Sequence, residues 1–264
     1  MRLFRQYLRN NDCFREGKKL KPAGVMVHST GANNPLVSRY VPGDEVIGQN
    51  TGGNHWDQSN AEWEKRFGVP LNKCVHAFVG KMADGGVGTV QTLPWEMRGW
   101  HAGNRKGNDG YIGFEICEDG LDDPEYFEQI YREAVELTAM LCRVFELDPG
   151  KEGVVICHAE GHRLGLASNH ADVLHWFSRF GKTMDDFRAD VAREKERGEE
   201  MTQEEFDAMM ENWLARQGEK PPSDWAGEAL EQAVKQGVTD GTRPQGFATR
   251  QEVVLMLAAA LAKG

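Results

Sequence analysis

The stretch Gly24-Val25-Met26-Val27-His28-Ser29 is a short, mostly apolar run that carries a histidine near its end. Its length and its valines are typical of a buried strand. A second run, from Val154 to Cys157, is followed in the same way by His158. If these two strands are neighbours in a sheet, both imidazoles point to one rim of that sheet. The two runs therefore predict the centre of the fold and a candidate site together.

Further strand and helix patterns surround these two runs. Residues 74–79 and 87–93 predict a hairpin, because Ala83-Asp-Gly-Gly86 between them is a good turn sequence. Residues 111–117 predict another strand. Pro124 to about Phe145 predicts a long helix, with apolar residues every three or four positions and Asp122 or Asp123 as its cap. The order of these elements predicts an α/β fold with a mixed central sheet flanked by helices.

The composition changes after Phe187. A charged stretch, 188–205, predicts a solvated helix, and Gly218-Glu-Lys-Pro-Pro-Ser223 is typical of a linker. Two short helical patterns follow at 224–236 and 249–262. We therefore expect three parts: a main domain over 1–190, a helical linker over 191–222, and a small all-α C-terminal domain over 223–264.

Composition also limits the function. The chain has 264 residues and a formal net charge of −10, which argues against tight nucleic-acid binding. Five scattered cysteines with no CxxC pair predict buried free thiols rather than a disulfide framework. We expect no transmembrane segment, and the N-terminus is too polar for a secretory signal peptide, so we expect synthesis in the cytoplasm.

Three histidines suggest a metal site. His170 lies 12 residues after His158, which is far enough for a loop to return to the rim where His28 is expected. Three imidazoles at one point can hold zinc with an open fourth position, the layout of a catalytic site. The alternative for each histidine alone is a hydrogen-bonded structural residue. His158-Ala-Glu-Gly-His162 does not match HExxH, and alternation along the strand turns Cys157 away from the site.

Four segments together resemble the zinc-dependent N-acetylmuramoyl-L-alanine amidases, a family that includes many phage endolysins and is related to the peptidoglycan recognition proteins. They are Val25-Met-Val-His-Ser-Thr30, Arg98-Gly-Trp-His-Ala-Gly103, Ile112-Gly-Phe-Glu-Ile116 and Ser168-Asn-His-Ala-Asp-Val-Leu-His-Trp-Phe177. Each segment alone is weakly specific. Their order, together with His158, over about residues 20–187 is a strong signal.

The resemblance implies a role for particular residues. It makes His28, His158 and His170 the zinc ligands, where the third ligand of the family is often Cys or Asp. It makes Glu115 the catalytic carboxylate. Strand alternation supports this assignment, since Glu115 shares a face with Gly113 and is turned away from the bulky apolar side of its strand.

Two further positions depart from the family pattern. A Lys often stands two residues before the third ligand and stabilises the tetrahedral intermediate, but Ser168 occupies that position here. His101 or Arg163 could supply the missing donor, and we favour His101. The active-site Tyr of the family falls near His76, which we include as a catalytic candidate.

Tryptophans and the loop before His170 supply candidate substrate contacts. Trp56, Trp100 and Asn169 are predicted to bind sugar or peptide, while a purely structural role for the tryptophans is equally consistent with the sequence. The resemblance implies that zinc activates a water, that the partner is peptidoglycan, and that the amide between N-acetylmuramic acid and L-alanine is cleaved. We expect an endolysin that reaches the wall after holin-type release. The alternatives are a non-catalytic peptidoglycan-binding module and an amidase that recycles soluble muropeptides.

The tail also carries a resemblance. Asp224-Trp-Ala-Gly-Glu-Ala, Gly237-Val-Thr-Asp-Gly and Phe247-Ala-Thr-Arg-Gln-Glu252 are similar to a single S-layer-homology repeat, a type of wall-anchoring module. The resemblance implies wall binding. A small helical hairpin that packs or forms homo-oligomers is the alternative.

Overall fold

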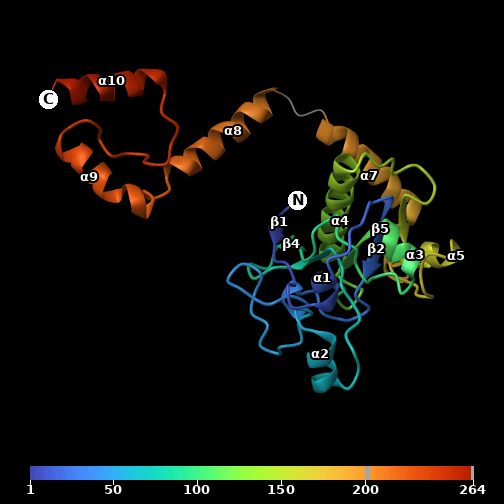
Figure 1. Ribbon diagram of the computed structural model, residues 1–264. Helices are drawn as coiled ribbons and strands as arrows, with labels where there is room; N and C mark the ends of the chain where they lie inside the picture. Colours follow the sequence, from blue (N-terminus) through green and yellow to red (C-terminus); the bar gives the residue numbers. More distant parts are fainter. Residues whose placement is uncertain (200–202, 263–264) are drawn as a thin grey trace. The chain divides into compact units, whose positions relative to one another are not determined.

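The computed structural model describes residues 1–199 and 203–262 and divides the chain into two compact units, 1–199 and 200–264 (Figure 1). The described part of the first unit contains one six-stranded sheet in the order β1-β4-β3-β5-β2-β6. The strands are β1 (Leu3–Arg5), β2 (Gly24–Ser29), β3 (Ala77–Lys81), β4 (Val87–Gln91), β5 (Tyr111–Ile116) and β6 (Val155–Cys157). Strands β3 and β4 pair antiparallel, and the other neighbouring pairs are parallel. The predicted mixed sheet flanked by helices is confirmed.

Helices surround this sheet. They are α1 (Asp12–Glu16), α2 (Asn60–Phe67), α3 (Arg105–Gly110), α4 (Pro124–Val144), α5 (His158–Arg163), α6 (Leu174–Phe177) and α7 (Met184–Glu199), with 3₁₀ turns at Val37–Arg39 and Ser178–Phe180. The expected strands at 24–29 and 111–117, the hairpin and the long helix are all present. Strand β1 was not predicted.

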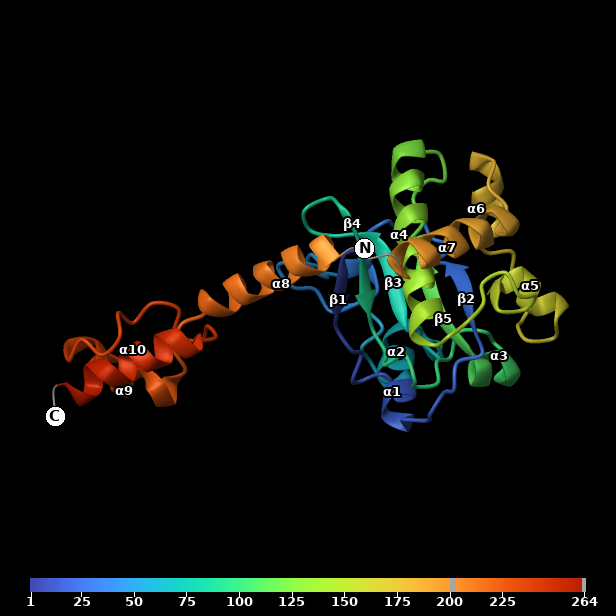
Figure 2. The same cartoon turned by 90° about the horizontal axis from the view of Figure 1, so that it is seen from above.

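The long helix α4 covers one face of the sheet, and α7 packs against it (Figure 2). Asp123 starts α4, because its carboxylate accepts hydrogen bonds from the backbone N–H groups of Glu125 and Tyr126 at 3.0 and 3.1 Å. Tyr131 of α4 donates to Asp190 of α7 at 2.8 Å. The apolar faces of β2 and β5 are buried beneath α4. His28 on β2 and Glu115 on β5 therefore lie on the opposite face.

The core under α4 contains Val25, Val27, Ile112, Phe114 and Ile116. Successive strand residues point to opposite faces, so this burial turns His28 and Glu115 away from α4. A second apolar cluster lies under the long loop between β2 and β3. All five cysteines are free and buried, as predicted.

The second unit is helical in its described part. It contains α8 (Gln203–Gly218), a 3₁₀ turn at Asp224–Ala226, α9 (Gly227–Lys235) and α10 (Arg250–Leu261). Among residues 209–262, only Gly218 is buried. Large apolar side chains are instead exposed, and Trp225 and Leu261 are 89% and 81% accessible. The described helices include none that is both long enough and apolar enough to cross a bilayer.

Candidate active site

The sheet places His28 and His158 beside each other. Strand β2 lies between β5 and β6, and Val27 pairs with Cys157 across the parallel β2–β6 ladder. His28 follows Val27 on β2, and His158 follows Cys157 as the first residue of α5. Two positions that are 130 residues apart in the chain are thus brought to one edge of the sheet.

A set of polar contacts fixes the turn from β6 into α5. The carboxylate of Glu160 accepts a hydrogen bond from the backbone N–H of Cys157 at 3.2 Å. The guanidinium of Arg188, which lies on α7, donates to Glu160 and to the carbonyl of Val155, both at 3.0 Å. These contacts hold the first turn of α5, and with it the ring of His158, against the sheet.

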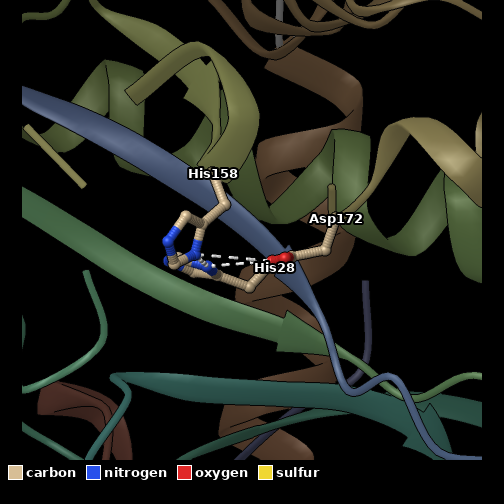
Figure 3. A group of neighbouring side chains, drawn as sticks. All are labelled: His28, His158 and Asp172. Atoms are coloured by element: carbon tan, nitrogen blue, oxygen red, sulfur yellow. Dashed lines mark hydrogen bonds and ion pairs between the residues drawn. The ribbon is translucent and has the colours of Figure 1, made fainter. Parts of the chain in front are cut away.

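His28, His158 and Asp172 point toward one another in Figure 3. His28 Nδ1 lies 3.2 Å from Asp172 Oδ2 and 3.0 Å from His158 Nδ1. His158 Nδ1 lies 3.6 Å from the same carboxylate oxygen. Two ring nitrogens and one carboxylate oxygen therefore converge on a small volume, within 4.8 Å of one another.

Asp172 occupies the place in this group that the sequence led us to expect for His170. His170 Nδ1 approaches His158 at 3.3 Å, but on the Nε2 side of the ring, away from the Nδ1 atom that faces Asp172. The ring of His170 also contacts Ser168 Oγ at 3.0 Å, and its side chain is exposed. The loop thus turns the carboxylate inward and leaves the imidazole at the surface of the cleft.

Glu115 stands beside His28. The two residues are paired in register across β5 and β2. Glu115 Oε2 is buried and has no hydrogen-bond partner. Burial raises the pKa of this carboxyl to about 7, although the neighbouring His28 acts in the opposite direction. A carboxyl group with such a pKa can both accept and release a proton near neutral pH.

The charge states of the group suit cation binding. Burial, with a smaller contribution from His28, lowers the pKa of His158 to about 4, so this ring is neutral at pH 7. Burial opposes ionisation of Asp172, but its hydrogen bond to His28 keeps its pKa below the usual value. Neutral imidazole and ionised carboxylate are the forms that bind metals.

Comparison with known proteins identifies the family. Residues 18–173 match the family described as N-acetylmuramoyl-L-alanine amidase, which is more than half of the chain. The chain belongs to this family. The matched region includes all three residues of the converging group as well as Glu115. Membership assigns the chemistry: this amidase cleaves peptidoglycan between N-acetylmuramic acid and L-alanine.

The chain is also similar to solved structures, and one of them reaches a TM-score that supports the fold. The hydrolase AmiA of Staphylococcus aureus, solved with its ligand, is 17% identical with a TM-score of 0.50, over 74% of this chain and 83% of that one. A mutant endolysin from Bacillus subtilis is 20% identical with a TM-score of 0.43, over 72% and 99% of the two chains. PlyL is 17% identical with a TM-score of 0.47, over 72% and 97%. No curated protein sequence matches the chain.

A cleft of about 390 Å³ opens over the converging group of the amidase. Trp56 and Trp100, both predicted to bind substrate, line it, whereas Asn169 is exposed and lies outside the lining. Trp56 is only 8% accessible and packs edge-on against Tyr40 and Phe78, so most of its ring belongs to the core. The residues that line the cleft are His28, Ser29, Thr30, Gly31, Trp56, Asn72, Lys73, Val75, Trp100, His101, Gly103, Glu115, His158, Ser168, His170, Ala171, Asp172 and His175.

Two other candidates of the amidase, His76 and Arg163, lie outside the cleft lining. His76 is fully buried outside the cleft lining; its Nδ1 accepts from the N–H of Gly113 at 3.0 Å and its Nε2 donates to the carbonyl of Met97 at 2.8 Å. Burial lowers the pKa of His76 to about 4. Arg163 pairs with Glu160 at 3.6 Å and does not line the cleft. His101 lines the cleft and contacts His28.

Asp172 and Lys73 are two charged cleft residues that the sequence analysis did not assign to the site. Asp172 stands in the quoted segment 168–177, and the frequency of Asp as third ligand in this family was the signal that could have identified it. Lys73 lines the cleft close enough to Glu115 to influence the pKa of its carboxyl. Lys73 lies in the long loop before β3, where no periodic pattern indicates which side chains face inward.

Proposed function

We propose that the amidase is zinc-dependent, that His28, His158 and Asp172 hold the zinc, and that the wall polymer itself is the substrate, as in an endolysin. One observation carries the proposal: two imidazole nitrogens and a carboxylate oxygen converge beside a buried, unpartnered Glu115 oxygen. Zinc in catalytic sites takes three such ligands and leaves one position open.

The donor set fits zinc rather than a harder cation. Mg²⁺ and Ca²⁺ prefer oxygen ligands, whereas imidazole nitrogen suits zinc. The His28, His158 and Asp172 group supplies two nitrogens and one oxygen, all at the edge of an open cleft.

His28, His158 and Asp172 would hold the zinc, which would supply Lewis acidity and lower the pKa of a water molecule toward neutral. Glu115 Oε2 is the chain's own acceptor for that proton, since it is buried, unpartnered and close to His28. The same oxygen then returns the proton to the amine of L-alanine as the amide bond breaks.

The developing negative charge on the carbonyl oxygen needs a donor. With Asp172 as third ligand, the position two residues earlier, where the family often has Lys, is His170. His170 lines the cleft and is exposed. We therefore assign to His170 the role first considered for His101. Removing a donor of this kind typically costs about 3 kcal/mol of activation free energy.

The first experiment digests purified peptidoglycan sacculi with the zinc-reconstituted protein and analyses the products by mass spectrometry. New L-alanine amino termini are expected, and a chelator should abolish them. Glu115→Gln should lower the rate by about 10²–10⁴-fold and still bind zinc, because it loses only the proton acceptor. Glu128→Gln, an exposed change on α4, is the matched control.

The outcomes separate the candidate functions. Binding to sacculi without any new amino termini would favour a non-catalytic peptidoglycan-binding module. Cleavage of soluble muropeptides but not of sacculi would favour a recycling amidase. Full activity of Glu115→Gln would contradict the role assigned to this carboxylate.

A further inference from the structure

His101 contacts the converging group through His28, on the side of the His28 ring that faces away from Asp172. Its Nδ1 lies 3.0 Å from His28 Nε2, and its Nε2 lies 3.0 Å from the backbone carbonyl oxygen of Tyr111. Both ring nitrogens therefore have a partner within the protein. The contact with His28 is on the ring nitrogen opposite the one that faces Asp172.

These two contacts determine where the protons lie. A carbonyl oxygen can only accept, so the Nε2 of His101 must carry a hydrogen. In a neutral ring the other nitrogen, Nδ1, is then an acceptor. His28 Nε2 must consequently be the donor, which makes Nδ1 the ring nitrogen that a metal ion can occupy in place of the hydrogen bond to Asp172.

The local structure holds His101 firmly in this position. Both backbone N–H groups of the turn, those of His101 and Ala102, donate to Asn108 Oδ1 at 3.0 and 2.9 Å. The ring lies against Gly113 of β5, where a Cβ atom would come within 2.3 Å of the imidazole. Glycine at 113 is thus required by the position of the His101 ring.

We propose that His101 is a positioning residue that holds His28 in the tautomer whose Nδ1 binds metal. This inference rests on the proposed function, because it presupposes a metal bound by His28. Partners of this kind are known to set the tautomer and the orientation of metal-binding histidines. His101 presents no free N–H group to the substrate, and this distinguishes it from the oxyanion donor.

A similar arrangement supports His158. Its Nε2 lies 3.1 Å from Ser168 Oγ, and that hydroxyl lies 3.3 Å from the carbonyl oxygen of Ala102. The hydroxyl can donate to Ala102 and accept from His158 Nε2, which leaves His158 Nδ1 bare. The turn that carries His101 therefore fixes both histidine ligands, one through a side chain and one through a carbonyl.

The test compares His101→Leu with His101→Asn, two side chains that both branch at Cγ. The Asn oxygen can take the place of Nδ1 and accept from His28, while Leu cannot. Zinc affinity, measured by competition with a chelating dye, should fall by about 10–100-fold in the Leu variant and clearly less in the Asn variant. Equal affinities in wild type and both variants would overturn the proposal.

A second readout needs no metal. In the metal-free wild-type protein at pH 8, ¹⁵N NMR of the histidine rings should show His28 with a protonated Nε2. His101→Leu should convert this signal to a mixture of the two tautomers. An unchanged His28 pattern in the Leu variant would show that His101 has only a structural role.

A third variant tests the close contact between the His101 ring and Gly113. Gly113→Ala should displace the His101 ring and weaken zinc binding, whereas Gly110→Ala, where a Cβ meets open space, should leave affinity unchanged. Equal zinc affinity in the two glycine variants would also contradict the proposal. If the wild-type protein itself binds no zinc, the proposed function fails, an outcome distinct from a zinc-binding wild type with an insensitive His101→Leu variant.

Discussion

Asp172 and His170 lie two residues apart on one loop, yet they face different sides of His158. Asp172 approaches the Nδ1 side together with His28, and His170 approaches the Nε2 side. Removing a metal ligand lowers the zinc affinity, whereas removing an oxyanion donor lowers kcat. The two residues can therefore be told apart by mutation.

Asp172→Asn should weaken zinc binding by more than His170→Asn, because a carboxylate ligand contributes charge that an amide lacks. His170→Asn should lower kcat by about 10²–10³-fold, with zinc affinity close to wild type. Isothermal titration with zinc and amidase kinetics measure the two quantities. The reverse order of zinc affinities would restore His170 as the third ligand.

Glu115 predicts a pH dependence of the metal-free protein. Burial raises its pKa from the ordinary 4.5 to about 7, so the folded state holds this proton more tightly than the unfolded state. The stabilising contribution is complete below pH 4.5 and is lost as the pH rises to about 7. Metal-free Glu115→Gln has no such titration. Its stability relative to wild type should rise across this window by at most about 3 kcal/mol.

Urea denaturation of both chelator-treated proteins at pH 4.5 and pH 8 measures this difference. A gap between wild type and Glu115→Gln that is the same at both pH values would contradict the raised pKa. Zinc must be absent, since the charge of the ion would itself stabilise the carboxylate.

At the scale of single residues, the sequence was informative where a side chain belongs to a regular element. His28, His158 and Glu115 sit on or directly after strands, so strand alternation and pairing predicted that they meet. Asp172 lies in an irregular loop between α5 and α6, where no period indicates which side chain turns inward. The sequence predicted His170 from this loop as the third ligand, whereas the structure brings Asp172 beside His28 and His158.

At the scale of the elements, α4 shows how local signals combine. Asp123 caps its first turn, Pro124 occupies the first helical position, and the apolar face packs on the sheet. Asp123→Ala should lower the free energy of unfolding by about 1 kcal/mol, because the N–H groups of Glu125 and Tyr126 lose their acceptor.

The neighbouring Asp122→Ala is the matched control. Asp122 is exposed and is not the cap, so its substitution should change the denaturation midpoint little. Equal effects of the two substitutions would show that the cap contributes nothing beyond the general charge of this end of the helix.

Elements with strong periodicity were predictable, and β1 was not. It has three residues and pairs in parallel with β4, so that Leu3 lies opposite Thr89. So short an edge strand has no alternating pattern of its own. Its pairing is determined by residues more than eighty positions away, which single-sequence reasoning does not reach.

At the scale of the whole molecule, the residues proposed to act in catalysis all lie in the first unit. A chain that ends at Glu199 should keep its activity on soluble muropeptides, because every residue that lines the cleft precedes α7. Lost activity in this shortened chain would show that the second unit contributes to the cleft. The intact chain is the control.

The role of the second unit follows from the same deletion. Its described part buries almost none of its apolar side chains, so the tail is expected to act through binding to the wall or to other copies of itself. Sacculus pull-down and sedimentation of the intact and shortened chains measure these two properties. A loss of pull-down alone would support the S-layer-homology resemblance, and a loss of oligomers alone would support self-association.

The pairing of β2 with both β5 and β6 has a consequence for the newly made protein. The amino acids of β2 leave the ribosome before their partners in β6 and before the Asp172 loop, which are translated more than a hundred codons later. Until that stretch has emerged, a nascent chain holds only His28 of the ligand group. Enzymatic competence thus arises at a late point of translation, and chains that terminate early lack a complete ligand set.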